Sequence, residues 1–64
     1  MQEHQKRVIA EYDDLFTRTT ALNRFFGTEV FTALDEAERD RLRRQWEHMQ
    51  LYGQVLAERI NAFS

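Results

Sequence analysis

The feature that most constrains the fold of this chain is a regular spacing of apolar and near-apolar side chains in its first half. These positions are four, three, four, three and four residues apart, and they are Val8, Tyr12, Leu15, Thr19, Leu22 and Phe26. The spacing follows one face of an α-helix, and the two-residue alternation of a β-strand does not fit it. The pattern predicts a long amphipathic helix over residues of about 3–26.

A second run with the same spacing covers the second half of the chain. Its members are Leu42, Trp46, Met49, Gly53, Leu56, Ile60 and Phe63. We expect a helix over residues of about 36–63, with Asp35 as its N-cap and Glu38 completing a capping box, while Thr32 is a competing N-cap. The connection at 27–35 has apolar residues without a helical period. We expect it to form a turn or short helix that plugs the closed end of a hairpin.

The register between the two helices can also be predicted. Helices joined by a short connection run antiparallel, and the numbers of facing residues then add up to about 64. This register places Tyr12 opposite Gly53 and Val8 opposite Leu56. Glycine inside a helix is less favourable than alanine by about 1 kcal/mol, and a facing aromatic ring would explain its presence here.

The length of the chain points to self-association. Sixty-four residues bury too little apolar surface for comfortable stability as an isolated monomer, and no cysteine is present to form disulfides. We therefore expect an all-α, antiparallel two-helix hairpin that forms a single domain over residues 1–64 and assembles into a homo-oligomer, with a four-helix bundle as the smallest complete core. The predicted oligomer interface consists of Ile9, Phe16, Leu51 and Val55.

The charge balance excludes some classes of partner. The formal net charge is −2 and the pI is about 5.6, so the chain lacks the positive field of a general DNA-binding or RNA-binding protein. No apolar run approaches the roughly twenty residues of a membrane span, and residues 1–6 lack the apolar segment of a signal peptide. We expect a cytosolic location, with no membrane partner. A local site for one small anion stays open.

Polar and aromatic residues gather where the predicted hairpin brings the start of the first helix to the end of the second. The candidate ligand-binding residues are His4, Gln5, Arg7, Tyr12, Tyr52 and Arg59. Arginine grips phosphate through its planar fork and aromatic rings offer faces for bases, so this set is typical of a nucleotide site. Two other interpretations stay open: the helix ends fray, or Arg59 pairs with Glu3 or Glu11.

The remaining polar residues favour surface roles. The densest basic cluster is Arg39, Arg41, Arg43 and Arg44, and acidic residues alternate with it, so we interpret it as a solvated helix face. His4 and His48 would lie far apart on the hairpin, which argues against a shared metal site. No serine or threonine has a convincing base nearby, and we expect neither catalysis nor a cofactor.

Four loose motifs spread over nearly the whole chain carry a resemblance. They are His4-Gln5-x-Arg7-Val8, Phe31-x-x-Leu34-Asp35-Glu36, Leu42-x-x-Gln45-x-x-x-Met49 and Tyr52-x-x-Val55-Leu56-x-x-Arg59-Ile60. Together they resemble a widespread family of very short phage and prophage proteins named after an uncharacterised product of a crAss-like phage. The resemblance implies a small accessory protein that acts in the host cytoplasm. It also implies that the polar residues at the open end of the hairpin belong to the recurring pattern.

The resemblance leads to three hypotheses about function. In the first, the chain counters host defence by sequestering a cyclic nucleotide-type immune signal without cleaving it. In the second, it inhibits a host protein that it binds through an exposed helical face. In the third, it is a structural or regulatory phage component. Its partners would be copies of itself together with either the nucleotide signal or a host protein.

Overall fold

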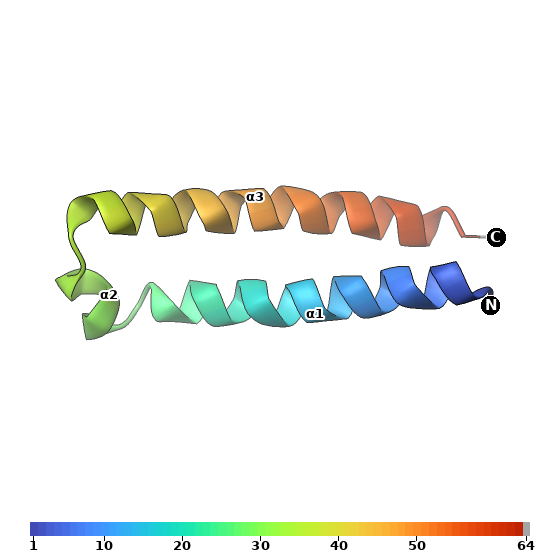
Figure 1. Cartoon of the computed structure of the whole chain (residues 1–64), viewed down its shortest axis with the longest axis horizontal. Helices are drawn as coiled ribbons and strands as arrows, with labels where there is room; N and C mark the ends of the chain where they lie inside the picture. Colours follow the sequence, from blue (N-terminus) through green and yellow to red (C-terminus); the bar gives the residue numbers. More distant parts are fainter. Residues whose placement is uncertain (64) are drawn as a thin grey trace.

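The computed structural model describes residues 1–63, and they form three helices. These are α1 (Glu3–Phe25), α2 (Glu29–Ala33) and α3 (Glu36–Asn61). The two long helices lie side by side and antiparallel, with both termini at one end and α2 at the other (Figure 1). The hairpin measures 46 × 15 × 13 Å. The predicted all-α fold and antiparallel hairpin are confirmed, and assembly into a bundle stays a prediction.

The closed end of the hairpin is filled by aromatic rings. The hydroxyl of Thr28 accepts a hydrogen bond from the Phe31 N–H at 3.2 Å, which starts the short helix α2. Phe31 is buried, and its ring centroid lies 5.8 Å from that of Phe25 and 5.0 Å from that of Phe26. The ring of Phe26 in turn lies 6.3 Å from that of Trp46 on α3. We call these four residues the aromatic plug; it ties α2 and both long helices together.

The start of α3 differs from its predicted form. Asp35 is the N-cap residue, but its side chain makes no capping hydrogen bond. The carboxylate of Glu38 instead accepts a hydrogen bond from Arg41 Nε at 2.7 Å. Bonded in this way to the following turn, the Glu38 carboxylate does not reach back to the N–H of Asp35. The predicted capping box is therefore wrong, although the predicted N-cap residue is correct.

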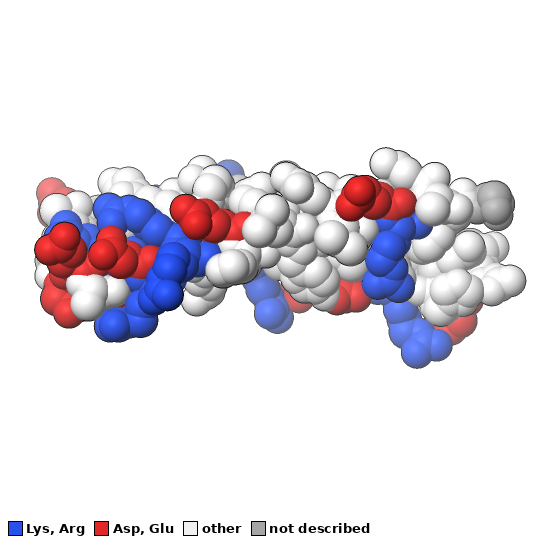
Figure 2. All heavy atoms as spheres, turned by 90° about the horizontal axis from the view of Figure 1, so that it is seen from above, with Lys and Arg blue, Asp and Glu red and all other residues white. Residues whose placement is uncertain are grey.

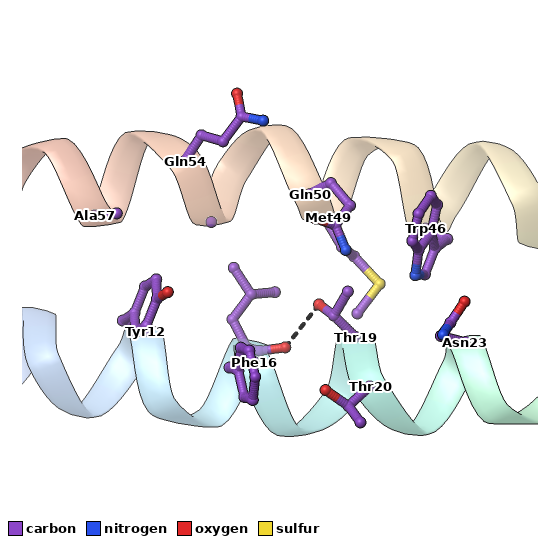
Figure 3. A pocket seen from close by; sticks show the side chains of 12 residues that line it. Tyr12, Phe16, Thr19, Thr20, Asn23, Trp46, Met49, Gln50, Gln54 and Ala57 are labelled. Atoms are coloured by element: carbon purple, nitrogen blue, oxygen red, sulfur yellow. Dashed lines mark hydrogen bonds between the residues drawn. The ribbon is translucent and has the colours of Figure 1, made fainter.

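The register between α1 and α3 also differs from the prediction. Figure 3 shows Tyr12 across from Ala57, about one helical turn beyond Gly53. Gly53 faces Leu15 instead, since a Cβ atom at Gly53 would lie 3.7 Å from Leu15 Cδ2. The reason is visible in Figure 1: α2 lies beyond the end of α1, so the first turns of α3 lie beside α2. The predicted pairing of Tyr12 with Gly53 is wrong.

The core of the hairpin is thin. Among residues 1–63 the buried side chains are Val8, Thr19, Phe31 and Leu56. Several large apolar side chains remain on the surface, including Phe16 at 62% exposure, Leu51 at 56% and Val55 at 52%. Surface of this kind is costly to leave in water, and it marks places where a ligand or another chain can pack.

Candidate ligand-binding groove

A groove of about 300 Å³ runs along one face of the hairpin, between α1 and α3 (Figure 3). It lies in the middle of the molecule, between the aromatic plug and the open end. The lining residues are Tyr12, Leu15, Phe16, Thr19, Thr20, Asn23, Trp46, Met49, Gln50, Gly53, Gln54 and Ala57. Its volume is at the lower end of the range for small-molecule sites.

Aromatic side chains from α1 form one wall of the groove. Tyr12 and Phe16 are four residues apart, and successive turns of a helix bring such residues next to each other. Their ring centroids are 6.4 Å apart and the ring planes are only 24° from parallel. Across from this wall, Gly53 on α3 has no side chain, so the groove stays open at its level. The arrangement can accept a flat group against the rings.

Amide side chains supply most of the polar groups. Asn23 lines the groove from α1, and Gln50 and Gln54 line it from α3, with the Gln54 amide pointing away from α1 (Figure 3). Each carries both donors and an acceptor, so together they can bond either kind of polar edge. The hydroxyl of Thr19 is already committed, because it donates to the Leu15 carbonyl oxygen at 2.7 Å (Figure 3).

The indole of Trp46 adds a further donor at the end of the groove nearest the aromatic plug. Its Nε1 atom is buried, and it has no hydrogen-bond partner among residues 1–63. Figure 3 shows this nitrogen on the side that faces α1, with the Asn23 side chain reaching up beside it. Buried donors are nearly always paired in folded proteins, so this one is a candidate to bond an acceptor on a bound molecule, provided that a neighbouring side chain moves and uncovers it.

The groove lining is uncharged. None of its residues is an acid, a lysine, an arginine or a histidine. No cluster of histidine, cysteine, aspartate or glutamate within residues 1–63 could hold a metal ion. None of the helices in the same residues is long and apolar enough to cross a bilayer. The groove therefore suits an uncharged group better than an anion.

The six residues predicted as a ligand site do not share the groove. Tyr12 lines the groove. Tyr52 is exposed and does not line it; its position lies two residues before Gln54, or about 200° around α3. Gln5 acts at the start of α1, where its Oε1 accepts a hydrogen bond from the Gln2 N–H at 3.0 Å. A ligand-binding role for these residues stays a prediction.

The other predicted site residues are on the surface near the open end. His4, Arg7 and Arg59 are exposed, and no ion pair involves them within residues 1–63. The alternative in which Arg59 pairs with Glu3 or Glu11 is thus absent from the described part of the chain. All three side chains are free to contact a ligand or another copy.

Two of the four arginines in the cluster on α3 form ion pairs. Arg41 pairs with Glu38 at 2.7 Å and Arg43 with Asp40 at 3.2 Å. The guanidinium carbon of Arg43 also lies 5.2 Å from the centroid of the Phe31 ring, in a cation–π arrangement. The interpretation as a solvated face fits Arg41, Arg43 and Arg44, which are exposed, whereas Arg39 is half-buried and its Nε atom is buried.

Comparison with known proteins shows that the chain is similar to a phage protein and matches a family model. It is 33% identical over 63 residues to an uncharacterised 7.5 kDa protein in the denB–rIIB intergenic region of Enterobacteria phage T4, and the match covers 98% of both chains. No solved structure matches it. The predicted resemblance to a short phage protein is confirmed, whereas the crAss-like name is not. Residues 2–62 match the Sequestin family, and with this coverage the chain belongs to the Sequestin family.

Proposed function

We propose that this chain sequesters a small nucleotide-type immune signal, cyclic or otherwise closed, in the cytoplasm of the infected host. The family name denotes sequestration, and the T4 relative is a phage protein. The structural observation that supports the proposal is the uncharged groove, where two nearly parallel rings lie along the same lining as a buried, unpaired indole N–H. This combination suits a planar base with polar edges.

The base would lie against Tyr12 and Phe16. Stacking of a base on an aromatic side chain contributes about 1–3 kcal/mol and tolerates different bases, because every base has a flat face. Asn23, Gln50 and Gln54 would bond the edge of the base and select among bases. The indole N–H of Trp46 would donate to a ring nitrogen or carbonyl oxygen.

Phosphate groups would contact arginine outside the groove. Arg7 and Arg59 are the residues that the sequence suggests, and both are exposed near the open end. Arg59 follows Gln54 by five residues, which is a rotation of about 140° around α3. Within a single hairpin, Arg59 therefore lies on a different side of α3 from the edge of the groove that Gln54 lines. A ligand that uses both elements would therefore span two copies, and homo-oligomerisation is part of this proposal.

The proposed activity is capture without cleavage. The groove lining offers hydroxyls and amides, and it contains no carboxylate or imidazole that could act as a general base. A protein of this kind works by stoichiometry, so the bound signal should be recovered intact. If the protein cleaved the signal instead, the nucleotide recovered after binding would differ from the nucleotide that was added.

The test is a calorimetric titration against cyclic di- and trinucleotides and cyclic ADP-ribose isomers, followed by chromatography of the ligand released on denaturation. We expect one class to bind tightly and to be released unchanged. Tyr12→Ala should reduce the affinity at least tenfold. Val30→Ala is the control, because Val30 is exposed and does not line the groove. If none of the compounds produces heat on titration, the proposal is wrong, and the hypothesis that the chain inhibits a host protein is favoured.

A further inference from the structure

The middle of α3 is uncharged on all sides, although the helix is highly charged elsewhere. No acidic or basic residue other than His48 occurs between Glu47 and Glu58. Figure 2, which looks at the molecule from the α3 side, shows an uncharged surface between two groups of charged side chains. The groove accounts for only one side of this segment. Leu51 and Val55 do not line the groove, and both are more than half exposed.

These two residues belong to a second helical seam on the outer side of α3. Its positions are four, three, four, three and four residues apart, and they are Arg44, His48, Leu51, Val55, Glu58 and Ala62. All six are exposed. The spacing is that of the contact face between two packed helices. We call this set the outer stripe, and α1 does not cover it.

The order of residues along the outer stripe makes it complementary to itself in one orientation. Basic Arg44 and the imidazole of His48 precede the apolar pair, and acidic Glu58 follows it. When two such stripes run antiparallel, Leu51 of each lies level with Val55 of the other, and His48 lies level with Glu58. A parallel arrangement would place Glu58 against Glu58 and Arg44 against Arg44, which is unfavourable.

We propose that a second copy of this chain packs its α3 antiparallel on the outer stripe, in a two-fold symmetric dimer. Leu51 and Val55 from both copies form the centre, and His48 and Glu58 pair on either side of it. The apolar centre with polar pairs at its edges is the usual arrangement of a protein interface. The two hairpins then form a row of four long helices with the α3 pair in the middle, and the grooves stay open.

The groove face suits a second copy less well. Its edges carry Thr20, Asn23, Gln50 and Gln54, which would each need a polar partner in a dry interface. The outer stripe has no such amides. The dimer rests on the proposed function, because it specifies the self-association that forms part of it. The dimer forms without a ligand, so dimerisation and nucleotide binding can be tested, and can fail, independently.

The test is the mass of the purified chain without nucleotide, measured by light scattering during gel filtration at micromolar concentrations. We expect a dimer for the natural sequence, and a monomer for Val55→Glu. Phe16→Glu is the matched control, because Phe16, like Val55, is more than half exposed but lies on the groove face. A monomeric natural sequence, or an assembly lost with Phe16→Glu and kept with Val55→Glu, would overturn the proposal.

Two further variants test the orientation. His48→Glu should weaken the dimer at least tenfold by placing two acids together, and the double variant His48→Glu, Glu58→Arg should restore it. The chain has no cysteine, so a disulfide between two introduced cysteines shows directly which positions of the two copies lie next to each other. A mixture of Leu51→Cys and Val55→Cys chains should form the mixed disulfide under mild oxidation. Preferential linking of Leu51→Cys to itself would indicate a parallel pair and contradict the antiparallel arrangement.

Discussion

Gly53 in the middle of α3 lies directly against Leu15 of α1, and the space between them is large enough for a methyl group. A Cβ atom at position 53 would be 3.7 Å from Leu15 Cδ2, which is an ordinary van der Waals distance. Close packing of the helices therefore does not require glycine here. Because glycine is less favourable than alanine in a helix by about 1 kcal/mol, its presence in the groove calls for a functional reason.

Gly53→Ala should stabilise the hairpin by up to about 1 kcal/mol, the difference in helix propensity between the two residues. Urea unfolding followed by circular dichroism measures the change. The same variant should weaken nucleotide binding, since the new methyl group occupies space in the groove. Ala57→Gly, one turn later on the groove side, is the converse control and should destabilise by a similar amount. A destabilised Gly53→Ala variant would contradict the packing described here.

Phe31→Ala should remove the centre of the aromatic plug. Truncating a buried phenylalanine costs about 3–5 kcal/mol, which is a large share of the stability of a small domain. We expect the thermal transition to broaden and move to a much lower temperature. Val30→Ala, at the neighbouring position with 63% exposure, should leave the transition almost unchanged. Equal effects of the two variants would show that α2 does not hold the closed end.

The sequence predicted the helices well because their apolar spacing records which face is buried. It predicted the N-cap residue of α3, but the capping box was wrong because Glu38 is bonded to Arg41. The register was wrong by about one turn, since it depends on where α2 lies, and the apolar pattern of 27–35 does not specify this. Tyr12 was predicted as a site residue. Trp46 and the groove amides were missed. Trp46 belongs to the apolar seam, and Asn23, Gln50 and Gln54 each follow a seam position by one residue, where a polar side chain is typical of the solvated edge of a helix.

Trp46→Phe should separate binding from packing. Phenylalanine keeps most of the contact with Phe26 and removes the buried, unpaired N–H. An unpaired buried donor costs about 1–3 kcal/mol, so the variant should be as stable as the natural sequence or more stable. Calorimetry should show affinity for the nucleotide reduced by about tenfold, the value of one hydrogen bond. Unchanged affinity would show that the ligand does not use this donor.

The double variant Arg7→Ala, Arg59→Ala tests the phosphate contacts predicted from the sequence. Both side chains are exposed and no ion pair within residues 1–63 involves either of them, so helical content should not change. The double variant should lose its affinity for the charged nucleotide. Its affinity for the corresponding nucleoside, which has no phosphate, should equal that of the natural sequence. Arg18→Ala, on the outer side of α1 and paired with Asp14, is the control. Retained affinity would exclude these two arginines from the site.

The most direct test of the central claim is to map the binding site by nuclear magnetic resonance on isotope-labelled protein, titrated with the same nucleotides. We predict that one of them shifts the indole N–H resonance of Trp46 and the side-chain amide resonances of Asn23, Gln50 and Gln54. Resonances of Phe25, Phe26 and Phe31, the residues of the aromatic plug that do not line the groove, should move little. If no nucleotide shifts any groove resonance, or if the shifts are confined to residues outside the groove, the groove is not the site of sequestration.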